Sequence, residues 1–250
     1  MKKWTRRELI IAFNLYCQLP FGKIHSRNPI IMKVAKRLNR TSASIAMKML
    51  NFASLDPIIT DSGRHGLGNA STADKEIWQE FQRNWERMTL EGQRLLRVAK
   101  ALPITKLTDE INVDFAGRTR KATVDVRLKQ SFFRQAVLSS YQSRCCMSGL
   151  DDPRLLIASH IVPWNKDKAN RLNPSNGLCL SALHDKAFDQ GLITVLPNLA
   201  IRISKQVAGS KNDFCKRALV SLEGKKINLP EKFVPSSEFL AYHNENIFLS

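Results

Sequence analysis

The sequence predicts an α+β chain in which a helical N-terminal region precedes a C-terminal unit built around two strands and a helix. Apolar residues recur at helical spacing through residues 1–60, between residues that favour helix ends. In residues 155–195, short apolar runs flank an Asn-Gly turn and lead into a capped helix. We therefore divide the chain into residues 1–60, 61–125 and 126–250.

Three helices are predicted in residues 1–60. The first begins at Thr5 and Glu8, which fit the two positions of a capping box. The second can begin at Pro29, because proline suits the first turn of a helix. Thr41 fits the N-cap of the third helix. Two short helices joined by a tight turn resemble a helix-turn-helix.

The same 60 residues carry eleven Lys and Arg against two acidic residues, so their net charge of +9 is more than half of the chain's +17. A basic surface of this kind attracts nucleic acid, although the charges could also simply solvate a helical bundle. The first interpretation predicts a DNA-binding module in which the third helix contacts bases and neighbouring cations contact phosphates. The predicted DNA contacts in this module are Arg40, Ser42, Ser44 and Lys48.

Residues 61–125 are predicted to form a largely helical connector that could mediate dimerisation. Their aromatic stripe is more typical of core packing or a dimer contact than of base stacking. Residues 117–121 lie between short alternating runs and could form a hairpin tip. There, Arg118 and Arg120 are candidates for contact with the DNA backbone, with a solvated turn as the alternative. The stripe comprises Ile77, Trp78, Phe81 and Trp85.

The segment 155–195 holds the residues with the clearest chemical potential. The apolar run at 155–158 predicts a strand that carries His160 at its far end. Asn176, followed by glycine, favours a tight turn. Ser181 then fits the N-cap of a short helix. Strand, loop, strand and helix together predict one compact unit.

These residues suit the hydrolysis of a phosphodiester. Histidine titrates near neutrality, so His160 could take a proton from the attacking water. Asp185 and Asp189 are four residues apart and share a helix face, where two carboxylates could hold a hard cation. Asn176 could orient the imidazole by hydrogen bonding across the loop. Each pattern alone has a purely structural explanation, but their joint occurrence favours a catalytic site.

Residues 127–195 resemble the HNH endonuclease family in its restriction-endonuclease branch. The resemblance begins with the lead-in RLKQSFFRQAVLSSYQSRCCMSG and continues through the motifs SHIVPW, NG and HDKAFD. The resemblance implies a ββα-metal fold, a β-hairpin and helix around one divalent metal, Mg²⁺ or Mn²⁺. Residues 21–56 are also similar to the N-terminal region that accompanies such domains in bacterial restriction enzymes. The family pattern implies His160 as general base, Asn176 as the middle asparagine, and Asp185 and Asp189 as metal ligands. His184 is either a further ligand or only a neighbour of one.

The sequence departs from the family pattern at two places. Ser159 stands where many members carry another metal ligand, so the metal would depend more on Asp189, on His184 or on water. Many relatives also hold a structural zinc ion with two Cys-x-x-Cys pairs, which this chain lacks, and we therefore expect no structural zinc. The cysteines in question are the adjacent Cys145 and Cys146 and the isolated Cys179 and Cys215.

Together these features predict a metal-dependent endonuclease acting on double-stranded DNA, of a sequence-specific restriction or phage-defence type. The alternatives are an RNA or non-specific nuclease effector, and a DNA-binding regulator with a degenerate nuclease fold. A single HNH site has one base and one metal, so cutting both strands suggests a homodimer on a symmetric site.

Composition agrees with a nucleic-acid partner and excludes some other classes. The sequence pI is about 10.0, and a field of this sign accelerates capture of polyanions. No apolar run approaches the roughly 20 residues of a membrane span, and no signal peptide is recognisable. Five cysteines without regular spacing fit a reducing compartment. We therefore expect a cytoplasmic protein without a membrane partner.

Overall fold

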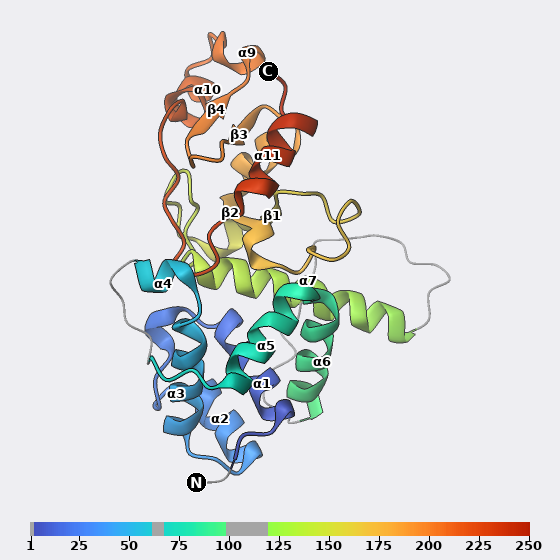
Figure 1. Ribbon diagram of the computed structural model, residues 1–250. Coiled ribbons are helices and arrows are strands. Elements are labelled where there is room, and N and C mark those ends of the chain that lie inside the picture. The colour runs from blue at the N-terminus through green and yellow to red at the C-terminus, as the bar shows by residue number, and fades with distance from the viewer. Residues whose placement is uncertain (1–2, 62–67, 99–119) are drawn as a thin grey trace. The chain divides into compact units, whose positions relative to one another are not determined.

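The computed structural model describes residues 3–61, 68–98 and 120–250 (Figure 1). The chain divides into two compact units, residues 1–136 and residues 137–250. Each unit is described by itself below. Among the described helices, none combines the length and the apolar composition needed to cross a bilayer.

The first unit is helical, and its helix α1 packs against α3, α5 and α6. On α1, the ring of Phe13 lies 4.2 Å from that of Phe81 and 5.0 Å from that of Phe52, between ring centroids. All three side chains are fully buried. The helices of this unit are α1 (Arg6–Gln18), α2 (Pro29–Leu38), α3 (Ser42–Ala53), α4 (Pro57–Asp61), α5 (Thr72–Arg83), α6 (Trp85–Val98) and most of α7 (Arg120–Ser140), with a 3-10 turn η1 (Phe21–Lys23).

The three helices expected in residues 1–60 are confirmed, together with their caps. Thr5 and Glu8 form the capping box of α1. Pro29 is in the first turn of α2, where the side chain of Asn28 accepts from the backbone N–H of Ile30. Thr41 caps α3. These caps accept hydrogen bonds from backbone N–H groups that have no partner within the helix. Because the capping residues lie next to the helices, the helix starts could be predicted from the local sequence.

The described helices of the expected connector, α5 and α6, belong to the first unit. Helices α5 and α6 pack against α1 and against each other, and Ile77, Phe81 and Trp85 of the aromatic stripe are buried in the core of the first unit. The fourth residue of the stripe, Trp78, is half-buried. The boundary between the units falls after residue 136, within α7, instead of after residue 125.

The predicted hairpin tip at residues 117–121 lies partly outside the described residues. Arg118 is one of the residues that are not described. Arg120 is the first residue of α7, so it begins a helix and not a hairpin. Its side chain also lies outside the described part of the chain.

The second unit contains two small antiparallel sheets. Strand β1 (Leu156–His160) pairs with β2 (Gly177–Ser181) in a register that sets His160 opposite Gly177. The helix α8 (Ala182–Asp189) follows at once and packs against β1, β2 and β3. The remaining elements are β3 (Ile193–Val195) paired with β4 (Ile201–Ile203), the helices α9 (Lys205–Ala208), α10 (Asp213–Ala218) and α11 (Ser237–Asn246), and the 3-10 turns η2 (Pro153–Leu155), η3 (Pro174–Asn176) and η4 (Val220–Leu222).

The predicted order of strand, loop, strand and helix is confirmed, and Ser181 caps α8 by accepting from the backbone N–H of His184. After α8, the strands β3 and β4 form a second antiparallel pair. Near the C-terminal end of the second unit, the chain forms the helix α11. Leu240 and His243 are buried on this helix, so packing against the unit stabilises it.

Candidate functional site

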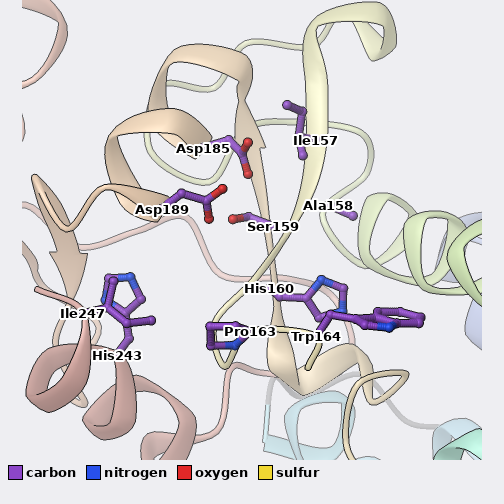
Figure 2. A pocket seen from close by; sticks show the side chains of 10 residues that line it. All are labelled: Ile157, Ala158, Ser159, His160, Pro163, Trp164, Asp185, Asp189, His243 and Ile247. Carbon is purple, nitrogen blue, oxygen red and sulfur yellow. The ribbon is translucent and has the colours of Figure 1, made fainter. Parts of the chain in front are cut away.

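The predicted catalytic segment forms one wall of a pocket of about 330 Å³ in the second unit (Figure 2). Its lining comes from β1 and the loop after it, from α8, and from α11 with the residue that follows it. The lining residues are Ile157, Ala158, Ser159, His160, Pro163, Trp164, Asp185, Asp189, His243 and Ile247.

His160 is the last residue of β1 and is held as a neutral base. Its Nε2 donates a hydrogen bond to the backbone carbonyl of Arg171, at 2.9 Å. Since a carbonyl oxygen only accepts, Nε2 carries the proton and Nδ1 is the basic nitrogen. Burial lowers the pKa of His160 to about 4, so the imidazole is neutral near pH 7. The ring of Trp164 stands edge-on to it, with 5.4 Å between centroids, and restricts its rotation.

Asp185 and Asp189 lie one turn apart on α8 and both face the pocket. Figure 2 shows their carboxylates and the hydroxyl of Ser159 pointing toward one another. Burial raises the pKa of both carboxyls, and the charge of Asp185 raises that of Asp189 further. A hydrogen bond from Ser159 lowers the pKa of Asp185 in part, and the nearby Lys186 partly offsets the rise at both carboxyls. Two carboxylates that destabilise each other's charged form would be stabilised by a cation between them.

The donor set indicates which kind of metal this pocket suits. Within residues 3–61, 68–98 and 120–250, no group of three or more His, Cys, Asp or Glu side chains gathers around one point. Zinc normally takes three or four such ligands, whereas Mg²⁺ is often held by one or two carboxylates with waters and substrate phosphates. Asp185 and Asp189 could hold a hard divalent cation in this way.

His184 does not line the pocket, although it was a candidate metal ligand. Its Nε2 donates to the backbone carbonyl of Ala218 at 3.0 Å, and its Nδ1 lies 2.9 Å from Ser181 Oγ and 3.5 Å from Cys145 Sγ. Both ring nitrogens are thus used inside the fold. Of the two interpretations left open, the structure favours a neighbour of the ligands that stabilises the unit.

Asn176 is fully buried, but it does not orient the imidazole as predicted. Its Oδ1 accepts from the backbone N–H of Val162 at 2.8 Å, and its Nδ2 donates to the carbonyl of Val162 at 3.2 Å. Asn176 therefore fixes the chain just after β1. The carbonyl of Arg171 takes the predicted role of selecting the imidazole tautomer.

Arg40 and Lys48, predicted to contact DNA, are buried in ion pairs instead. The guanidinium of Arg40 donates to both oxygens of Glu8 at 2.9 Å, and its side chain is only 7% exposed. The ammonium of Lys48 lies 2.9 Å from both oxygens of Asp74. Each cation therefore has an acidic partner that is distant in sequence, and neither side chain is exposed in the way a contact with DNA needs. Ser42 and Ser44, half-exposed at the start of α3, remain untested candidates.

His243 lines the pocket and was not among the site residues predicted from the sequence. Its ring stacks on that of Phe188, with centroids 3.6 Å apart, and its Nε2 donates to the Phe188 carbonyl at 3.2 Å. Its Nδ1 accepts from Thr194 Oγ1 at 2.8 Å. The helical spacing of Leu240, His243 and Ile247 was the available signal, since it is typical of a buried helix face.

Comparison with known proteins agrees with this geometry. Residues 145–196 match the model of a family described as HNH endonuclease, a match that spans β1, β2, α8 and β3. No curated protein matches the chain. The family match supports an HNH endonuclease assignment for this segment, and it indicates nuclease activity and a nucleic-acid substrate in general terms.

Proposed function

We propose that this chain is an HNH endonuclease that hydrolyses phosphodiester bonds of double-stranded DNA with one Mg²⁺ or Mn²⁺ ion. One observation carries the proposal. A single pocket holds a neutral histidine with a defined basic nitrogen and two carboxylates on one helix face. General-base hydrolysis assisted by a metal needs both.

The residues of the pocket divide the chemistry between them. His160 accepts a proton from the attacking water through Nδ1, while the Arg171 carbonyl keeps the proton on Nε2. Asp185 and Asp189 would hold the divalent ion. When bound, this ion supplies positive charge that stabilises the developing charge on the phosphate and on the leaving oxygen. Asn176 fixes the backbone after β1 through its hydrogen bond with Val162. This segment carries Trp164, whose ring contacts the imidazole of His160.

Duplex DNA is the proposed substrate because the chain carries a net charge of +17 and an N-terminal pair of short helices joined by a tight turn. A sequence-specific restriction or phage-defence role would use such a module. Cleavage of both strands by one-metal sites would require two sites, hence a homodimer. An effector that cuts RNA or any sequence would not need this module.

Nicking of supercoiled plasmid tests the catalytic assignment. We expect the wild-type chain to nick plasmid with Mg²⁺ and to lose this activity in EDTA. His160→Ala and Asp185→Ala should each abolish nicking while retaining DNA binding and a cooperative melt. His25→Ala and Asp213→Asn change an exposed histidine and an exposed aspartate outside the pocket and should stay active. Undiminished nicking by His160→Ala would rule out the assigned base.

A substrate panel separates the alternatives. Duplex DNA, single-stranded DNA and RNA are offered to the same preparation, and the ends of the products are sequenced. Preference for duplex DNA at defined positions supports the proposal. Equal cleavage of RNA supports a non-specific effector, and binding without cleavage supports a regulator with a degenerate nuclease fold.

A further inference from the structure

The distribution of charge within the first unit is uneven. Residues 9–55 contain seven Lys and Arg and no Asp or Glu, whereas α5 and α6 contain five of each sign. On α5 and α6 the charges offset one another locally. Helices α5 and α6 therefore add no net charge, whereas residues 9–55 add seven positive charges. Residues 1–8 and α7 are also net positive.

Two of these seven cations are neutralised inside the fold. Arg40 is paired with Glu8 and Lys48 with Asp74, and both side chains are less than a tenth exposed. The other five are exposed and make no ion pair with any residue that the structure describes. They are Lys23, Arg27, Lys33, Lys36 and Arg37.

The geometry of α2 gathers the exposed cations. Lys33, Lys36 and Arg37 are at positions i, i+3 and i+4 and share one helix face. The opposite side of α2, with Ile31 and Val34, is buried and holds the helix in place. We call the three exposed cations the α2 basic face.

The turn before α2 adds the remaining two cations and is tied to the helix. The side chain of Asn28 donates to the carbonyl of Lys23 at 2.9 Å and accepts from the backbone N–H of Ile30 at 2.9 Å. Lys23 and Arg27 are therefore held next to the start of α2. Exposed cations on a fixed scaffold suit a repeating array of phosphates, because binding then costs little ordering of the protein.

We propose that the α2 basic face binds the phosphate backbone of duplex DNA. The proposal rests on the DNA endonuclease function proposed above and replaces the expectation that Arg40 and Lys48 contact DNA. Contacts to phosphates hold a protein on the duplex and orient it without reading sequence. The α2 basic face thus supplies affinity, and any sequence preference must come from other residues.

Binding measured as a function of salt tests this surface. Fluorescence anisotropy with a labelled duplex is recorded for the triple variant Lys33→Gln, Lys36→Gln, Arg37→Gln in a His160→Ala background, which prevents cleavage. The expected result is at least a tenfold loss of affinity at low salt. The slope of log K against log salt should also fall by about 2.7, at about 0.9 for each lost phosphate contact.

The matched control removes the same charge from the same unit. Lys75→Gln, Arg83→Gln, Arg97→Gln changes three exposed cations on α5 and α6, where acidic residues alternate with basic ones. We expect nearly unchanged affinity and slope. An equal loss in both triple variants would overturn the proposal, because only the overall charge would then matter. Unchanged binding by the α2 variant would overturn it as well.

Nicking by the same triple variants with His160 intact separates this proposal from the proposed function. The α2 variant should need a higher protein concentration for the same extent of nicking, but at saturating protein it should nick at the wild-type rate. If the wild-type chain does not nick, the proposed function fails whatever the binding data show. If the α2 variant nicks normally at low protein concentration, only the α2 basic face is refuted.

Discussion

His160 and His243 line the same pocket, and burial lowers the pKa of each to about 4. An exposed histidine in the unfolded chain titrates near 6.5. Between these values the unfolded chain binds protons that the folded chain does not bind. The free energy of unfolding therefore rises with pH across this window and falls as the pH drops from about 6.5 toward 4.

His243→Phe tests this linkage, since phenylalanine keeps the stack on Phe188 but cannot titrate. Near pH 7 the free energy of unfolding of the variant should be about 1–3 kcal/mol lower than that of the wild type, because the Thr194 hydroxyl and the Phe188 carbonyl lose a buried partner. Urea unfolding at about pH 7 and about pH 5 should show a smaller pH dependence than in the wild type. An unchanged pH dependence would contradict a neutral buried His243.

The pair of Lys48 and Asp74 predicts a different stability effect. Lys48→Met leaves the fully buried Asp74 without its cation, and loss of one partner of a buried pair costs about 3–5 kcal/mol. Adding Asp74→Asn, which removes the charge but keeps an oxygen to accept the backbone N–H of Ser71, should recover part of this loss. Lys75→Met, at an exposed neighbouring position, is the control and should change the thermal midpoint little. A small effect of Lys48→Met would mean that Asp74 is solvated.

At the scale of elements, α8 depends on the C-terminal segment for its position. The ring and carbonyl of Phe188 both contact His243, and the backbone N–H of Leu249 donates to the Gly191 carbonyl at 2.9 Å. Gly191 has φ +67°, and a Cβ there would lie 2.1 Å from the carbonyl oxygen of Ile247. Only glycine allows this approach, which holds the end of α8 that carries Asp189.

Gly191→Ala should therefore destabilise the second unit and disturb Asp189. We expect a lower thermal midpoint and weaker Mn²⁺ binding by electron paramagnetic resonance, because the carboxylates would no longer lie at the same separation. Gly209→Ala is the matched control, since a Cβ there meets nothing within 4 Å and the φ is not positive. Normal Mn²⁺ binding by a folded Gly191→Ala variant would show that the turn does not position Asp189.

Elements could be predicted from sequence where their determinants are local. The caps at Thr5, Thr41 and Ser181 lie next to the helices they begin, and helical spacing marks the buried faces. Residue environments could not be predicted where partners are distant. Lys48 pairs with a residue 26 positions away, and His184 contacts a carbonyl 34 positions away. Nothing local to these residues distinguishes a buried ion pair from a DNA contact, or a structural histidine from a ligand.

At the scale of the whole molecule, all ten pocket-lining residues belong to the second unit. A fragment of residues 120–250 should therefore retain Mg²⁺-dependent nicking, and it should need more protein because it lacks the α2 basic face. Plasmid nicking across a range of protein concentrations measures both effects. A fragment that gives a cooperative melt but no nicking at any concentration would show that the first unit takes part in catalysis.

The matched family segment ends at residue 196, whereas His243 and Ile247 close the pocket from far beyond it. This has a consequence for exchanging nuclease modules between proteins. A transplant of residues 145–196 would carry the base and both carboxylates. It would leave behind β4, His243, which stacks on Phe188 of α8, and Ile247, whose carbonyl oxygen lies close to Gly191. The smallest portable cassette therefore extends to Leu249.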